Sequence, residues 1–144
     1  MQTPIVSEER NWAIAAHLSA LVAIAGLPFG HVLGPLVVYL IKGHESEFVG
    51  EHAKASLNYQ ITISILGIVA TIVAVVWSLG FILSSPSRMY PEATYGLGFV
   101  ALWFVLGIAI LVVLLLSIIF IIMGTIAARQ GRPYTYPFAI RFLR

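Results

Sequence analysis

The charged residues of this chain lie outside three long apolar intervals, which make up most of its 144 residues. The intervals 11–41, 55–87 and 93–128 contain 31, 33 and 36 residues without Asp, Glu, Lys or Arg. A helix of about 20 apolar residues crosses a hydrocarbon core roughly 30 Å thick, so each interval is long enough to span a bilayer. The pattern therefore predicts an all-α integral membrane protein, with residues 1–144 forming a single membrane domain.

Prolines and glycines interrupt the first interval. Pro28 and Pro35 fall with three glycines inside residues 26–35, and a continuous helix interior does not accommodate that combination. We expect helices over about 8–25 and 36–42. They form either one kinked span or a Pro/Gly-broken hairpin of two short helices. The second helix is short for a full crossing, which favours the hairpin.

A polar stripe leads into the second interval. At 100° per residue, five polar side chains fall on one arc of roughly 80°. They are Glu47, Glu51, Lys54, Asn58 and Thr62. The stripe predicts an amphipathic surface helix that leads directly into the third helix, together covering about 47–83. Its surface part offers four candidate residues for binding a partner, which are Glu47, Glu51, His52 and Lys54.

The third interval predicts a fourth helix over about 94–128, which completes a four-helix bundle. At 1.5 Å per residue it is about 50 Å long, so it must tilt or project from the bilayer. Gly131 and Pro133 end it, and residues 129–144 form an interfacial tail of the kind that suits the headgroup layer. The tail residues that could bind anionic lipids or a partner protein are Arg129, Arg132, Tyr134, Tyr136 and Arg141.

The composition supports a membrane protein and the charges indicate its orientation. Hydrophobic residues make up 60% of the chain and charged residues 10%, against roughly 25% charged in a soluble domain. Arginines beside a membrane helix are explained by the positive-inside rule better than by nucleic-acid binding, so no nucleic-acid partner is expected. With the tail in the cytoplasm, the hairpin places both termini and the 42–54 loop there and the 88–92 loop outside.

Few side chains could carry chemistry within the membrane. The polar candidates His17, Asn58, Gln60 and Thr62 are either clasps between helices or the lining of a polar pathway. The chain has no cysteine, and its histidines and acids fit no zinc-binding spacing, so we expect neither a metal nor a cofactor. It also has no Asp and no pairing of a nucleophile with an oriented base, so we expect no enzymatic activity.

Four blocks of the chain resemble a known family. They are Glu9-Arg10-Asn11-Trp12 with His17-Leu18-Ser19, Gly34-Pro35-Leu36, Phe48-Val49-Gly50-Glu51-His52-Ala53-Lys54 with Leu57-Asn58-Tyr59-Gln60, and Gly131-Arg132-Pro133-Tyr134 with Tyr136-Pro137. In this order they are similar to small bacterial membrane proteins with a Tic-twenty-like domain, distant relatives of a chloroplast inner-envelope import component. The resemblance implies four helices, no assigned reaction and a link to protein translocation.

We therefore expect a non-enzymatic, multi-pass subunit or adaptor of an assembly in the bacterial inner membrane, with protein translocation or insertion as the named candidate. Its partners would be the lipid bilayer and either another protein or further copies of the chain. The alternative is a small oligomeric transporter or channel for ions or small molecules. That alternative requires a pathway lined by His17, Asn58 and Thr62, and it fails if these side chains are sealed by packing.

The charge pattern makes a testable prediction of topology. Because the chain has no cysteine, single cysteines at Gln2 and Arg144 can be probed with a membrane-impermeant maleimide added to intact spheroplasts. Both should be protected and should react only after lysis. Labelling at Gln2 from outside, with Arg144 still protected, would instead identify a single span over 11–41.

Overall fold

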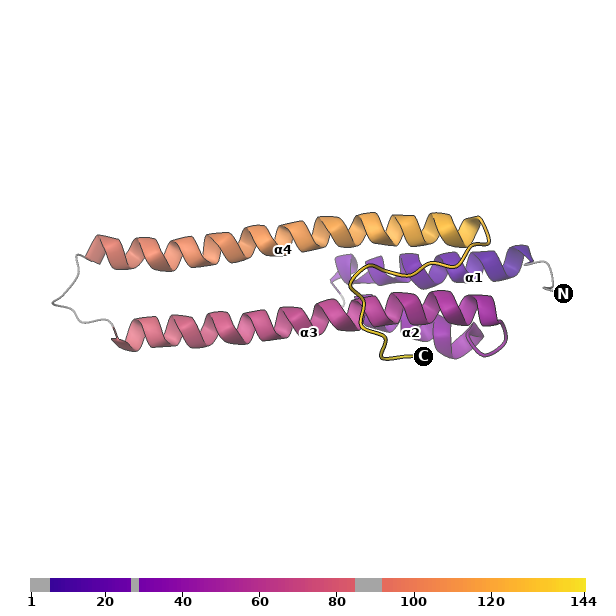
Figure 1. Cartoon of the computed structure of the whole chain (residues 1–144), viewed down its shortest axis with the longest axis horizontal. Helices are drawn as coiled ribbons and strands as arrows, with labels where there is room; N and C mark the ends of the chain where they lie inside the picture. Colours follow the sequence, from indigo (N-terminus) through magenta and orange to yellow (C-terminus); the bar gives the residue numbers. More distant parts are fainter. Residues whose placement is uncertain (1–5, 27–28, 85–91) are drawn as a thin grey trace. The chain divides into compact units, whose positions relative to one another are not determined.

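The computed structural model describes residues 6–26, 29–84 and 92–144, and within these ranges it contains helices and no strand. In chain order the elements are α1 (Ser7–Leu18), the 3-10 helix η1 (Ser19–Ala25), α2 (Gly30–Lys42), α3 (Glu47–Ser84) and α4 (Glu92–Arg129), as shown in Figure 1. The prediction of an all-helical chain with four α-helices is confirmed. Among the described residues, Glu47–Leu83 and Gly96–Arg129 are long and apolar enough to cross a membrane.

The long helices contribute to two compact units. The first unit combines Met1–Ser64 with Ile118–Arg144, and the second is Ile65–Ser117. The first unit thus holds α1, η1, α2, the beginning of α3, the end of α4 and the tail, while the second holds the remainder of the two long helices. Almost all of the charged residues belong to the first unit.

The N-terminal helices pack together, but with boundaries that differ from the prediction. The first helix changes to 3-10 geometry at Ser19, and α2 begins at Gly30, six residues before the expected start. Pro35 therefore lies inside α2, where it removes the N–H that would bond to the carbonyl of His31. The helix tolerates this loss because α2 packs along η1 and α1.

The start of α3 is tied to the start of α1 through Ser46. The Ser46 hydroxyl accepts the Val49 N–H at 3.4 Å and donates to the Glu9 carboxylate at 2.6 Å. Glu9 also accepts the Val6 N–H at 3.0 Å. The Ser46 bond, with help from the Val6 bond, lowers the pKa of Glu9. From Glu47, α3 runs unbroken through Asn58, so the expected continuity is observed.

Small residues form much of the core of the first unit. Ala13 and Ala16 of α1, Ala53 of α3 and Ala128 of α4 are all fully buried, and Ala20 of η1 is 3% exposed. Small side chains let helix backbones approach closely, which is how helices associate in membranes where apolar burial supplies no driving force between them. The first turns of α3 thus pack into the bundle on one side, while Glu47 and Glu51 on the other side are exposed.

The second unit presents apolar side chains outward along both helices. Leu66, Val73 and Trp77 of α3 and Leu97 and Phe104 of α4 are each at least 60% exposed. Water does not suit such a continuous apolar surface, whereas acyl chains do. The surface therefore supports a membrane location for this part of the chain.

Gly34 provides a test of the packing between η1 and α2. A Cβ atom at Gly34 would overlap the carbonyl oxygen of Ser19, whereas a Cβ at Gly67 of α3 would meet no atom within 4 Å. Gly34→Ala should lower the free energy of unfolding by about 1–3 kcal/mol, the usual cost of forcing atoms into a packed interface. Gly67→Ala is the control and should be neutral or slightly stabilising. Denaturant titration in detergent micelles compares them, and equal stabilities would contradict this packing.

Candidate functional site

Two histidines and a tyrosine meet inside the first unit and form a buried polar cluster. Nδ1 of His17 lies 2.8 Å from the Tyr136 hydroxyl, and its Nε2 lies 2.8 Å from Nδ1 of His52. The three side chains are 0%, 5% and 1% exposed for His17, Tyr136 and His52. A neutral imidazole donates through one nitrogen and accepts through the other. His17 therefore donates a hydrogen bond to one of its two partners and accepts one from the other.

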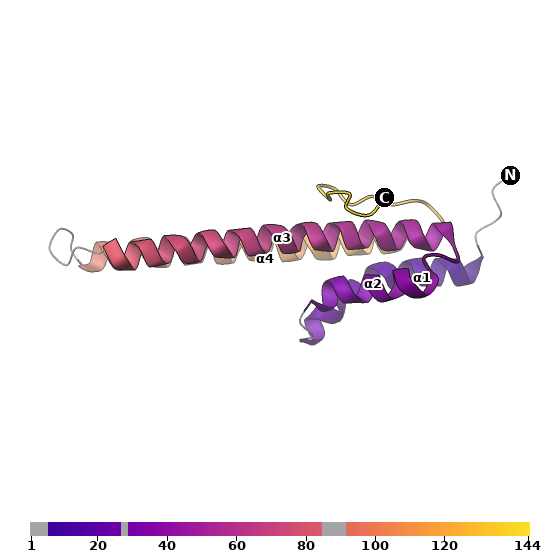
Figure 2. The same cartoon turned by 90° about the horizontal axis from the view of Figure 1, so that it is seen from below.

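His17 reaches this position between α3 and α4. Figure 2 shows α1 and α2 on one side of the first part of α3 and the C-terminal tail on the other side. A Cβ atom at Gly124 of α4 would lie only 2.9 Å from the His17 ring, so glycine at this position makes room for the ring. The bond from His17 to Tyr136 therefore joins elements that lie on opposite sides of the long helices.

Aromatic rings hold Tyr136 in place. Its ring stacks on that of Tyr59, with centroids 4.6 Å apart and an angle of 17° between the planes. Tyr134 contacts it edge to face at 5.0 Å, and Phe120 contacts Tyr59 at 5.9 Å. Burial raises the pKa of Tyr136, so its phenol stays protonated and can share that proton with His17.

The tail is also fixed to α3 by Asn58, which uses both ends of its side-chain amide. Nδ2 donates to the carbonyl of Leu143 at 3.0 Å, while Oδ1 accepts the N–H groups of Phe142 at 3.0 Å and Leu143 at 2.8 Å. One turn further, the Thr62 hydroxyl accepts the Ile140 N–H at 2.9 Å and donates to the Asn58 carbonyl at 2.6 Å. The inner end of the polar stripe thus binds the chain's own C-terminus.

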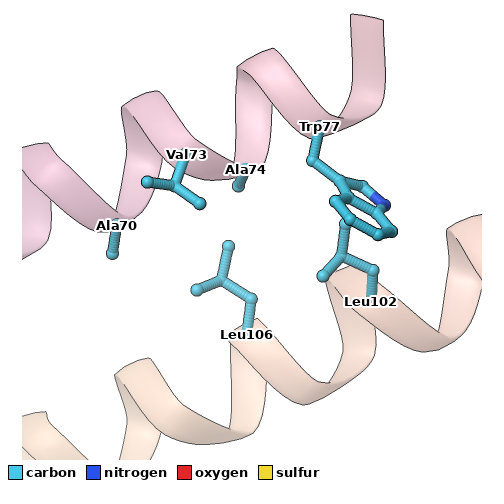
Figure 3. Close-up of a pocket in the computed structure, with 6 residues that line it drawn as sticks. All are labelled: Ala70, Val73, Ala74, Trp77, Leu102 and Leu106. Atoms are coloured by element: carbon cyan, nitrogen blue, oxygen red, sulfur yellow. The ribbon is translucent and has the colours of Figure 1, made fainter. Parts of the chain in front are cut away.

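The second unit has a different kind of cavity. A hollow of about 350 Å³ lies between its two helices, as Figure 3 shows. Its lining residues are Ala70, Val73, Ala74, Trp77, Leu102 and Leu106. The side chains around it are apolar, so it suits acyl chains and offers little to a polar solute. Within the described ranges, no group of three His, Cys, Asp or Glu side chains is placed to hold a metal ion.

Comparison with protein-family models gives a match over residues 8–143 to MamF/MmsF, the magnetosome magnetite crystal formation protein family. The chain belongs to the MamF/MmsF family. The matched range includes the whole histidine–tyrosine cluster and the tail contacts of Asn58 and Thr62. Searches of curated proteins and of solved structures give no match.

In this MamF/MmsF protein, the polar residues predicted within the membrane are buried. His17, Asn58, Gln60 and Thr62 are at most 5% exposed. His17 is bonded to side chains of the bundle, and Asn58 and Thr62 to the tail backbone. These bonds engage the three side chains within the first unit, where they are sealed from solvent.

The residues predicted at the surface divide into two groups. Glu47 and Glu51 are exposed and Lys54 is partly exposed, whereas His52 lies in the interior, because a shift of 100° per residue turns it to the neighbouring face of α3. In the tail, Arg129, Arg132 and Arg141 are exposed and Tyr134 is half-buried. Tyr136 is buried in the first unit.

The link between Tyr136 and His17 gave no signal in the sequence. The two residues are 119 positions apart, and no local spacing records a contact over that distance. The role of Gly124 was equally hidden, since a glycine among small residues indicates close packing but not the partner. The tail contacts of Asn58 also escaped prediction because they are made to backbone atoms, which every residue has.

The cluster predicts different effects for its two tyrosines. Tyr136→Phe should lower the free energy of unfolding by about 1–3 kcal/mol, because the partner nitrogen of His17 is left buried without a hydrogen bond. Tyr134→Phe is the matched control. Its hydroxyl is buried and makes no hydrogen bond, so its removal should cost close to nothing. Thermal unfolding in detergent measures both, and equal losses would show that the Tyr136 bond contributes no stability.

Proposed function

We propose that this MamF/MmsF protein is a multi-pass, non-enzymatic component of the magnetosome membrane that acts in magnetite crystal formation as a subunit or adaptor of a membrane assembly. The observation that carries the proposal is the family match over residues 8–143. The fold supports it in two ways. Among the described residues, two helices are long and apolar enough to span the membrane, and the buried His17 and Asn58 of the first unit bond to other groups of that unit.

The proposal includes a topology with both termini in the cytoplasm. The starts of α1 and α3 and the ends of α2 and α4 lie at one end of the first unit, and they carry most of its charges (Figure 1). Lys42 bonds to Glu45 there at 2.6 Å. In this topology the charged end faces the cytoplasm and is the surface for a partner protein. The 88–92 loop, which apart from Glu92 lies outside the described residues, is then expected on the side of the compartment that holds the crystal.

A wider relationship with Tic-twenty-like proteins is part of the proposal. It rests on the four sequence blocks, and the fold adds support because the blocks meet in space. Gly34 packs against Ser19, while His17, His52 and Tyr136 come from three blocks and form one cluster. The family description names crystal formation and not protein transport, so we attach no translocation step to this protein.

Transport of ions or small molecules receives no support from the described residues. The pathway needed His17, Asn58 and Thr62 along a polar lining, and all three are engaged inside the bundle. The one hollow described above, in the second unit, is lined by apolar side chains. Neither feature provides a route for a hydrated solute.

Deletion of the gene in its host tests the proposed function. Electron microscopy should show magnetite crystals with an altered distribution of size or shape, and the wild-type gene should restore it. Complementation with Gly67→Ala, a substitution in open space, should also restore it and controls for expression of a mutant chain. Crystals unchanged after deletion, with the protein shown to be absent, would refute a role in crystal formation.

A further inference from the structure

The C-terminal tail turns back on itself beside α3. It leaves the end of α4, runs along α3 away from the charged end and then returns, as Figures 1 and 2 show. Tyr136 lies on Tyr59, Ile140 bonds to Thr62, and Leu143 has come back to Asn58. Of these contacts, the one at Thr62 lies furthest along α3.

This turn lies well inside the apolar interval of α3. Lys54 is the last charged residue before that interval, and Thr62 follows eight residues later. At 1.5 Å per residue, this separation places Thr62 about 12 Å further along the helix. If α3 crosses the bilayer, the turn of the tail lies below the level at which Lys54 meets the headgroups.

Apolar side chains project outward at the turn. Phe138 has a φ of 64°, an uncommon conformation for a bulky residue, and its side chain is 91% exposed. Ile140 and Phe142 follow it and are 56% and 46% exposed. These three side chains point away from the bundle while the backbone between them bonds to α3.

Side chains of α3 satisfy part of the backbone of the turn. Irregular backbone is tolerated at membrane depth only where protein groups satisfy its polar atoms. Pro137 has no N–H, and the N–H groups of Ile140, Phe142 and Leu143 are bonded to Thr62 and Asn58. Asn58 also binds the Leu143 carbonyl. These bonds explain why two polar side chains lie so far inside an apolar interval.

Three arginines of the tail accompany the turn. Arg132 precedes it, Arg141 lies within it between Ile140 and Phe142, and Arg144 follows it, and all three are exposed. The sequence has no acidic residue from 93 to 144. Arginine keeps its apolar stem in the interface and its guanidinium at the level of the phosphates, so this arrangement complements an anionic lipid surface.

We propose that residues 133–144 form a re-entrant loop that binds anionic phospholipids. Phe138, Ile140 and Phe142 enter the boundary between headgroups and acyl chains, and Arg132, Arg141 and Arg144 bind the lipid phosphates. Hydrogen bonds with Asn58 and Thr62 hold the loop against α3. The inference is independent of the role in crystal formation, since it concerns only how the tail meets the bilayer.

Spin labelling tests the depth of the loop, because the chain has no native cysteine. The full-length protein is labelled at Phe138→Cys or Arg144→Cys and placed in vesicles of phosphatidylcholine and phosphatidylglycerol. Power saturation then compares collisions with oxygen, which concentrates in the membrane, and with a water-soluble nickel chelate. The label at 138 should show more oxygen and less nickel contact than the label at 144. Equal nickel contact at positions 138 and 144 would overturn the proposal. Low contact of the label at 138 with both reagents would show that protein surrounds it, which would also overturn the proposal.

A matched pair of threonines tests whether the hydrogen bond to Thr62 holds the loop against α3. Thr62 and Thr71 both donate to the carbonyl four residues earlier on α3, but only Thr62 also accepts a tail N–H. In the Phe138→Cys background, Thr62→Val should raise nickel contact at 138 about twofold or more, and Thr71→Val should leave it unchanged. Equal responses of the two variants would show that the Thr62 hydrogen bond does not hold the loop in place.

The lipid part of the proposal has its own measurement. Replacing phosphatidylglycerol by phosphatidylcholine removes the anionic headgroups and should move the label at 138 towards water, as increased nickel contact. The label at Phe138→Cys should otherwise keep its position when only the acyl-chain composition is changed. No response to the loss of phosphatidylglycerol would refute the binding of anionic lipids.

Discussion

The requirement to satisfy both nitrogens of a fully buried histidine organises the first unit. An imidazole inside an apolar bundle is costly unless each nitrogen has a hydrogen-bond partner. His17 finds one partner on α3 and the other on the tail, and it reaches both because Gly124 leaves space beside α4. A single side chain thereby joins α1, α3 and a segment 119 residues away. The alanine-rich contacts and the stacking of Tyr59 on Tyr136 are consistent with this arrangement, since both need backbones close together.

Much of the fold could be predicted because it follows from helix length and the absence of charge. The intervals that define α3 and α4 need no tertiary information, and Glu47 marks the start of α3 in both sequence and structure. The start of α2 could not be predicted in the same way. Pro35 signals a break locally, but one missing hydrogen bond is a small loss beside the packing of a whole helix. The packing of α2 on its neighbours therefore outweighed the local preference of Pro35 to end a helix.

In the candidate site, the polar positions on α3 could be predicted from the sequence, but their partners could not. The arc that contains Asn58 and Thr62 predicted that polar side chains continue into the apolar interval on one face of α3, and a buried amide requires partners. The identity of those partners depends on the tail backbone, which carries no residue-specific signal. The prediction for His52 was wrong, since its place beside charged residues indicated a surface position and the residue is buried. One step of 100° along α3 is enough to turn it inward, towards His17.

Orientation in the membrane decides how such a protein can influence a mineral. Five of its six acidic residues precede residue 52, and they gather at the charged end of the first unit. Three are already engaged, Glu9 with Ser46 and both Glu8 and Glu45 with Lys42. If this end faces the cytoplasm, as the arginine-rich tail implies, its carboxylates are separated from the crystal by the bilayer, and an effect on the crystal must pass through the membrane or a partner protein. If it faced the crystal, the same carboxylates could bind cations directly. The positive charges of the tail favour the first arrangement, so the proposed role is one of assembly and not of direct contact with the mineral.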